Sequence, residues 1–149
     1  MTNFSLNPQI ILDILIAYVY ALPVGWEREK HERSAGLRTF PLVCVAACVL
    51  VAVAVNSGNK DAPSRVVQGL IAGLGFIGGG TILKTGQAVH GTATAASLLV
   101  TAVIGVCVAS HLYDVGAMLS LLSLFTLRMF EAWRHLEPGI HKWDSEKSK

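Results

Sequence analysis

Long apolar runs alternate with short polar stretches along this chain of 149 residues. Five runs can be marked, at roughly residues 9–26, 40–56, 66–83, 94–111 and 113–130. Each run is close to the ~20 residues that an α-helix needs to cross the hydrocarbon core of a bilayer. The pattern therefore predicts an all-α, polytopic membrane protein, with five transmembrane helices in one domain over residues 1–130.

The polar stretches have the composition of turns and helix ends. The segment NSGNKDAPS at 56–64 is turn-forming, and Ser64 stands where it can cap the third helix. Residues 131–149 are too short for a domain, so we expect a short cytoplasmic tail. A brief amphipathic helix on the membrane surface and a solvated end fit that tail equally well.

Composition agrees with this fold class. Charged residues make up 15% of the chain, whereas soluble domains carry about 25%. The charges gather at 27–38, 59–65 and 128–149, and long stretches between them carry almost none. We therefore expect the chain to lie in the lipid bilayer, and we expect no nucleic-acid partner.

The distribution of lysine and arginine predicts the orientation. With the N-terminus outside, ten of the 12 lysines and arginines fall on the inside, and only Lys60 and Arg65 remain outside. Short cytoplasmic loops of membrane proteins carry an excess of these residues. The N-terminus is therefore expected outside and the C-terminus in the cytoplasm.

The third apolar run is rich in glycine, with six of the chain's 14 glycines between residues 69 and 80. Glycine lets membrane helices approach closely, so the run predicts a crowded helix at the centre of the bundle. A helical projection gives two stripes, which predicts packing on two sides; local unwinding beside a cavity is the alternative. The stripes are Arg65, Gly69, Gly73 and Gly80, and then Gln68, Gly75 and Gly79, with Gly78 opening the triplet Gly78–Gly80.

The fourth run carries small polar residues on one face, namely Thr94, Ser97 and Thr101, with Gly105 in line. Hydroxyls in a membrane helix can return their hydrogen bond to the preceding turn, so the stripe is weak evidence for a pore. Packing against the glycine helix explains it equally well.

Asp13 is the sharpest polar anomaly, because it lies one turn inside the first apolar run. A carboxylate at mid-membrane depth costs roughly 2.5–3.5 kcal/mol, and less near the interface. In the predicted orientation Asp13 and Arg65 share the outer leaflet, which makes them a candidate ion pair. The alternative is a shallow Asp13 that reaches water or caps its helix.

The first inner loop mixes both signs of charge. Glu27 and Glu29 stand among Arg28 and Lys30, directly after the first apolar run. Their oxygens suit a hard cation, but the neighbouring cations compete with it. Salt bridges within the loop are the favoured interpretation, and a metal site is the alternative.

Enzymatic motifs are not found. The chain has no GxxxxGK[ST], HExxH or GxSxG, and no nucleophile stands with a histidine base. The three cysteines lie in apolar runs and are expected to pack as small apolar side chains. We expect no enzyme activity and no cofactor.

Two motifs nevertheless resemble a known family. Gly25-Trp-Glu-Arg-Glu29 followed by Ala35-Gly-Leu-Arg-Thr39 looks like the inner loop of the MgtC/SapB family of bacterial membrane proteins. The run from Pro63-Ser-Arg65 through Gly73-Leu-Gly-Phe-Ile-Gly-Gly-Gly-Thr-Ile82 to Val89-His-Gly-Thr-Ala-Thr-Ala-Ala-Ser97 looks like its second signature. Pro23, Trp26 and Gly79 depart from the usual pattern, and longer members carry a soluble C-terminal domain that is not expected here.

The resemblance implies a multi-pass protein with five helices in the bacterial inner membrane. The family is linked to magnesium homeostasis at low magnesium, to stress response in acid, and to virulence. The residues that the motifs carry over are Glu27, Arg28, Glu29, Gly36, Leu37, Arg38, Thr39, Arg65, Gly73, Gly75, Phe76, Gly78, Gly80, Gly91, Thr94 and Ala95.

Two functions follow as expectations. The first is a non-enzymatic accessory or regulatory protein, which acts through helix contacts in a homo-oligomer or with another membrane complex. The second is a small oligomeric transporter of Mg²⁺ or protons, with Asp13, Glu27 or Arg65 along its path. Five helices without inverted repeats are a poor basis for a monomeric transporter.

Overall fold

The computed structural model describes residues 8–30, 35–85 and 88–136, and within them the chain forms five α-helices and one two-stranded hairpin. The side chains of residues 85, 88 and 130–136 are not described. The helices are α1 (Pro8–Glu29), α2 (Thr39–Asn56), α3 (Ala62–Thr81), α4 (Thr92–Ala109) and α5 (Tyr113–Leu136). The antiparallel strands β1 (Leu83–Thr85) and β2 (Ala88–His90) join α3 to α4.

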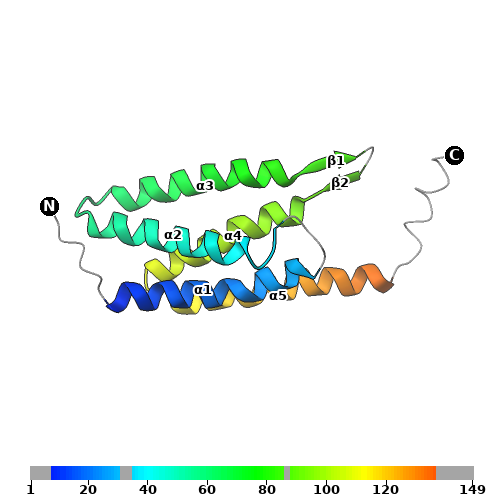
Figure 1. Cartoon of the computed structure of the whole chain (residues 1–149), viewed down its shortest axis with the longest axis horizontal. Helices are drawn as coiled ribbons and strands as arrows, with labels where there is room; N and C mark the ends of the chain where they lie inside the picture. The colour runs from blue at the N-terminus through cyan, green and yellow to red at the C-terminus, as the bar shows by residue number, and fades with distance from the viewer. Residues whose placement is uncertain (1–7, 31–34, 86–87, 137–149) are drawn as a thin grey trace.

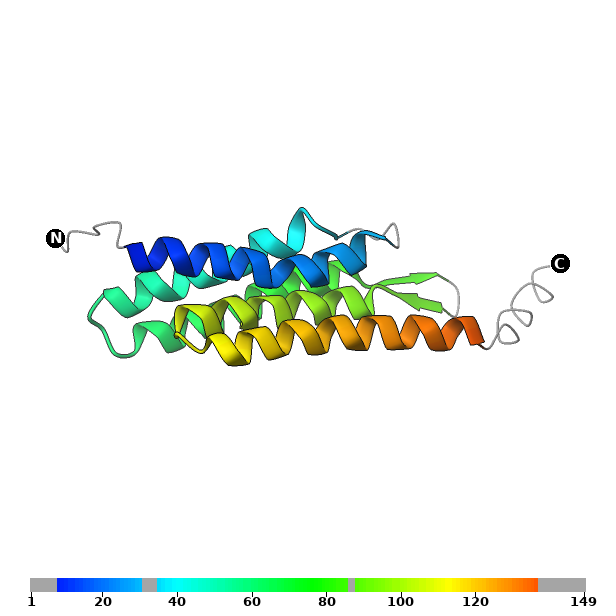
Figure 2. The same cartoon turned by 90° about the horizontal axis from the view of Figure 1, so that it is seen from below.

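The five helices lie side by side along one axis and alternate in direction (Figures 1 and 2). One end of the bundle holds the hairpin, the end of α1 and the start of α2, and we call it the hairpin end. The opposite end holds the start of α1, the α2–α3 turn at 57–61 and the α4–α5 turn at 110–112, and we call it the turn end.

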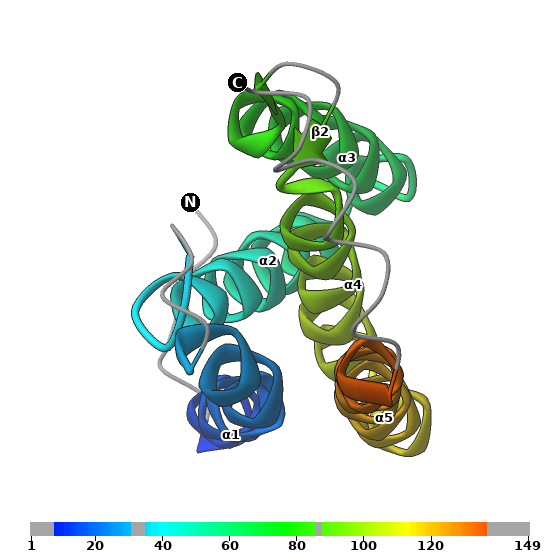
Figure 3. The same cartoon turned by 90° about the vertical axis from the view of Figure 1, so that its right-hand side faces the viewer.

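The centre of the bundle is α4, which packs against each of the other four helices (Figure 3). The close packing has a specific cause at Gly105, since a Cβ there would overlap the carbonyl oxygen of Cys44 on α2. The outermost helix is α3, whose main contacts are with α2 and α4. The prediction that the glycine helix lies at the centre is therefore wrong for the single chain.

The small polar face of α4 packs inside the bundle, but it contacts Arg28 of α1 and Cys44 of α2 rather than the predicted glycine helix. Thr94, Ser97 and Thr101 are all buried. The Ser97 hydroxyl donates to the Ala93 carbonyl at 2.7 Å, and the Thr101 hydroxyl to the Ser97 carbonyl at 2.8 Å. Both hydroxyls therefore form their hydrogen bonds within α4. Ser97 and Thr101 can pack against other helices without a polar partner there.

The element boundaries differ from the predictions in three places. The hairpin was not predicted, because its strands have only three residues each. Helix α3 begins at Ala62 after Asp61, so Ser64 lies inside the helix and is not its cap. Helix α5 continues to Leu136, six residues beyond the predicted end of the membrane domain. The rest of the expected tail, residues 137–149, lies outside the described residues.

Within the described part of the chain, α1, α2 and α4 are long and apolar enough to cross a membrane. The chain is therefore a membrane protein by length and composition of its helices. Apolar side chains also cover much of its surface, including Leu15, Leu42 and Phe125, each more than half exposed.

Candidate functional site: a buried charged cluster at the hairpin end

The last turn of α1 carries three consecutive charged residues. Glu27 and Arg28 are buried, with 5% and 3% of their surfaces exposed, while Glu29 is exposed. Consecutive residues of a helix project about 100° apart, so the three side chains point toward three different neighbours. We call these residues and their partners the charged cluster.

Glu27 faces α5. Its Oε2 atom accepts a hydrogen bond from Nε of Arg128 at 3.0 Å, which is also an ion pair. The Nζ atom of Lys30 lies 3.9 Å from the same oxygen. A buried carboxylate is costly unless it is paired, and here α5 supplies the pairing charge.

Arg28 faces α4. Its Nη2 atom donates a hydrogen bond to Oγ1 of Thr94, a residue with 2% exposure in the first turn of α4. Gly91 starts that turn with φ of 90°, a left-handed conformation that glycine adopts without strain. A Cβ at Gly91 would also overlap the carbonyl of Thr81, so glycine lets the end of α3 and the start of α4 approach each other.

Glu29 faces the segment that leads into α2. Its Oε2 atom accepts the backbone N–H of Leu37 at 3.0 Å. A Cβ at Gly36 would overlap the Glu29 carboxylate as it is placed here, so glycine leaves room for the bond from Leu37. The Gly36 carbonyl then accepts the N–H groups of Thr39 and Phe40 at 2.9 and 3.1 Å, which begins α2.

Both loop carboxylates have partners in the structure, although the closer ion pair of Glu27 runs to α5 and not within the loop as predicted. Glu27 binds Arg128 and Glu29 binds the backbone of Leu37, so each carboxylate has a partner within the chain. Among the described residues there is no group of three or more histidine, cysteine, aspartate or glutamate side chains that suits a metal ion. Arg38 lies beside the cluster in sequence but is exposed.

Asp13 lies at the turn end, far along α1 from the charged cluster. It is 3% exposed, and its Oδ1 atom accepts a hydrogen bond from the Tyr113 hydroxyl of α5 at 2.7 Å. The predicted ion pair with Arg65 is not among the ion pairs of the described residues, and Arg65 is exposed on α3. The reason is topological, because α5 packs beside α1, whereas the main contacts of α3 are with α2 and α4.

The glycines of α3 contribute little packing inside the chain. Gly78 alone of the six meets a neighbour, since a Cβ there would lie 3.2 Å from the Ala95 side chain of α4. At the other five, such a Cβ would have no atom of another helix within 4 Å: Gly69, Gly73, Gly75, Gly79 and Gly80. Gln68 is also exposed. The predicted contact on two sides is therefore not made within the described part of the chain, because Gly78, the glycine that meets α4, belongs to neither stripe.

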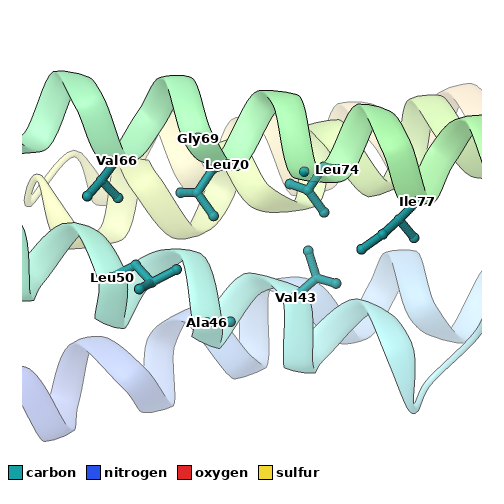
Figure 4. A pocket seen from close by; sticks show the side chains of 9 residues that line it. Val43, Ala46, Leu50, Val66, Gly69, Leu70, Leu74 and Ile77 are labelled. Atoms are coloured by element: carbon teal, nitrogen blue, oxygen red, sulfur yellow. The ribbon is translucent and has the colours of Figure 1, made fainter.

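A shallow groove separates α3 from α2 (Figure 4). Its volume is about 410 Å³, and its walls are apolar. The residues that line it are Val43, Ala46, Leu50, Val66, Gly69, Leu70, Gly73, Leu74 and Ile77. Apolar walls of this kind suit acyl chains or another apolar helix, and they give no path to a hydrated ion.

The sequence did not identify Arg128, Tyr113 or His111 as members of a site. Each meets a carboxylate of α1 about one hundred positions away in the chain: Arg128 meets Glu27, and Tyr113 and His111 meet Asp13. One signal of the first pairing was present in the sequence, because the predicted orientation places Arg128 and Glu27 on the same, cytoplasmic side of the membrane. The partner of Asp13 had no such signal in the sequence.

Comparison with known proteins gives a consistent result. The model of the MgtC family matches residues 14–136. An uncharacterized protein of Synechocystis, slr0014, is 34% identical over 139 residues, which cover 91% of this chain and 59% of the relative. The putative magnesium transporter YhiD of Escherichia coli K12 is 31% identical over 134 residues, which cover 84% of this chain and 62% of the relative.

The protein MgtC of Salmonella typhimurium is 38% identical over 96 residues, which cover 64% of this chain and 41% of the relative. The chain thus spans about three fifths of the length of the first two relatives, and less of the third. No solved structure matches the chain.

Proposed function

The chain belongs to the MgtC family, and from that premise we propose that it is a non-enzymatic accessory or regulatory protein of the bacterial inner membrane. It acts through contacts of its membrane helices with a second copy or with another membrane complex. A link to magnesium homeostasis is supported by the relative named a putative magnesium transporter.

Five crossings with a cytoplasmic hairpin end are part of this proposal. Helices α3 and α5 have 20 and 24 residues and run alongside the three apolar helices, so both have the length to cross. The hairpin end carries Arg28, Lys30, Arg38, Lys84 and Arg128, whereas the turn end carries Lys60 and Arg65. The positive-inside bias therefore supports a cytoplasmic hairpin end.

The observation that carries the proposal is the outward face of α3. Five glycines there have open space where a side chain would be, and Phe76 among them is 85% exposed. Glycine has a poor helix propensity, and on a lipid-facing surface it contributes no side-chain contact. In membrane helices it is enriched where a second helix approaches closely. A partner helix outside this chain would use this face.

The second candidate is a small oligomeric transporter of Mg²⁺ or protons. Two buried carboxylates on α1, Asp13 and Glu27, favour it, because such groups often mark ion paths. Both carboxylates are engaged within the bundle by Tyr113 and Arg128. These internal partners support the regulatory candidate.

One experiment tests the contact face in nanodiscs or mild detergent. Gly75→Leu with Gly79→Leu fills the open side of α3, and Ala93→Leu with Ala96→Leu is a control that adds comparable bulk at two exposed positions of α4. We expect the glycine double variant to fold but to lose the homo-oligomer, or a co-purifying membrane complex, that the control retains. Equal assembly of both variants would contradict the use of this face.

A second experiment separates regulation from transport. The purified chain is placed in liposomes that contain a Mg²⁺-sensitive or a pH-sensitive dye. The regulatory candidate predicts no flux above empty liposomes. Reproducible flux that Asp13→Asn or Glu27→Gln abolishes would overturn it in favour of the transporter.

A further inference from the structure

A polar chain connects the surface of the turn end to a buried carboxylate. The Tyr113 hydroxyl donates to Oδ1 of Asp13 at 2.7 Å and accepts from Nε2 of Gln9 at 3.0 Å. The Nδ1 atom of His111 lies 2.8 Å from the same hydroxyl oxygen and 4.0 Å from Oδ2 of Asp13. The His111 side chain is 59% exposed, whereas that of Asp13 is 5% exposed.

The hydrogen bonds of the Tyr113 hydroxyl determine which tautomer the His111 imidazole adopts. A phenolic hydroxyl has one proton and two acceptor positions. The proton of Tyr113 is given to Asp13, and one acceptor position receives the Gln9 amide. His111 must therefore donate from Nδ1, which leaves Nε2 as the nitrogen that can take a proton from water.

The backbone of His111 is held in an uncommon conformation. Its φ is 58°, and no other non-glycine residue in the described part of the chain has a positive φ. The N–H of His111 bonds to the Val108 carbonyl and that of Leu112 to the Cys107 carbonyl, both at 2.9 Å. This pair of bonds is the Schellman motif, and the position of His111 in it is usually glycine.

Histidine at a position that favours glycine costs backbone energy, which is commonly tolerated where the side chain has a role. Here the left-handed turn places the imidazole beside Tyr113 and Asp13. Histidine is also the side chain whose charge ordinarily changes between pH 5 and 8.

We propose that His111, Tyr113 and Asp13 form a proton-binding site, in which acid protonates Nε2 of His111 and fastens the α4–α5 turn to α1. This site goes beyond the proposed function and does not depend on it. The added proton makes an imidazolium that faces the Asp13 carboxylate at 4.0 Å, while Nδ1 keeps its hydrogen bond to Tyr113. The contact changes from a hydrogen-bonded chain to an ion pair across two helices and a turn.

The other titratable groups near the site are few among the described residues. Helix α2 contributes Cys48, whose thiol is close enough to Asp13 to interact electrostatically with it. Helix α4 ends near the site with Cys107, and α5 carries the exposed Asp114 next to Tyr113. Neither thiol supplies a positive charge, so the imidazolium of His111 would be the cation that faces Asp13.

The sign of the effect follows from linkage. The folded chain holds Asp13 beside the imidazole, whereas the unfolded chain does not, so a proton added to Nε2 gains a facing carboxylate only in the folded chain. Acidification from pH 7.5 to 5.5 should therefore stabilise the wild-type chain relative to a chain without His111.

The test measures thermal unfolding of the full chain in nanodiscs at pH 7.5 and 5.5. On acidification the midpoint of the wild type should rise by about 2–4 °C more than that of His111→Gln. Asp13→Asn should lose the same increment, and His90→Gln, at an exposed histidine of the hairpin end, should keep it. An increment that survives in His111→Gln would overturn the proposal.

Two further measurements separate the site from turn strain and from misfolding. His111→Gly should match or exceed the wild-type midpoint at pH 7.5, because glycine removes the left-handed strain, yet it should lose the acid increment. Nitrogen NMR of histidine-labelled chain, assigned by comparison with His111→Gln, should show the Nδ1–H form at pH 7.5. A neutral Nε2–H form there would contradict the site, whatever the stability of Asp13→Asn.

Discussion

Oε2 of Glu27 on α1 and Nε of Arg128 on α5 lie 3.0 Å apart, so the first helix of the bundle is paired directly with the last. Glu27 is buried, while the Arg128 side chain is 58% exposed. Loss of the ion pair should therefore cost more free energy at the buried carboxylate than at the exposed guanidinium. Lys30 is a weaker second partner, at 3.9 Å and half exposed.

Arg128→Ala is expected to destabilise the chain by about 1–2 kcal/mol, because it removes an ion pair at 3.0 Å from the buried Glu27 carboxylate. Adding Glu27→Gln to Arg128→Ala should recover part of that stability, because the neutral amide avoids a buried charge. Thermal unfolding of the four members of this double-mutant cycle measures the coupling. Strictly additive losses would show that the two side chains do not interact.

Thr94→Val is expected to cost about 1–3 kcal/mol, because it removes the oxygen that accepts from buried Arg28 and leaves the side chain nearly unchanged in volume. Thr94→Ser keeps the hydroxyl and loses one methyl group, so its cost should be smaller. The comparison is made by unfolding in the same detergent or nanodisc. A larger loss for serine than for valine would mean that packing matters more than the hydrogen bond.

Gly105→Ala is expected to destabilise the chain by about 1–3 kcal/mol, since its Cβ would overlap the Cys44 carbonyl and push α2 from α4. Gly69→Ala is the matched control, because α3 has open space at that position. There alanine should be neutral or stabilising by up to about 1 kcal/mol, through its higher helix propensity. Equal effects at the two positions would contradict the observed helix spacing.

The orientation can be tested with single cysteines in a chain whose three native cysteines are replaced by alanine. Lys60→Cys in the α2–α3 turn should react in intact cells with a membrane-impermeant maleimide. Lys84→Cys in the hairpin should react only after permeabilisation, because α3 crosses between the two positions. Labelling of both from outside would mean that α3 does not cross, and the reverse pattern would invert the orientation.

Helix positions were well predicted from the sequence, because long apolar runs leave few alternatives. The second run was placed at 40–56 and α2 spans Thr39–Asn56. The spacing also placed the hydroxyls of α4 on one face, although it did not show that α1 and α2 cover that face. The motif residues Glu27, Arg28, Glu29 and Gly36 do meet at one end of the bundle, although their partners Arg128 and Leu37 were not foreseen.

Which helix lies in the middle was predicted wrongly, for a physical reason. Six glycines in α3 favour close approach by another helix, but a local pattern does not say whether that helix belongs to the same chain. The single Gly105 of α4 has the closer intrachain contact, against Cys44. Likewise, the partner of Asp13 depends on which helix lies beside α1, and Tyr113 is one hundred positions away.

The bonds from α1 to α5 also constrain the order in which the chain can assemble. Asp13 meets Tyr113 and Glu27 meets Arg128 across 100 and 101 positions of sequence, one bond near each end of the bundle. Chains emerge from the ribosome N-terminus first. Helix α1 is therefore synthesised well before Tyr113 and Arg128, which complete these two bonds. A nascent chain that stops before α5 would lack both bonds, so the last helix joins α1 near each end of the bundle only when synthesis is nearly complete.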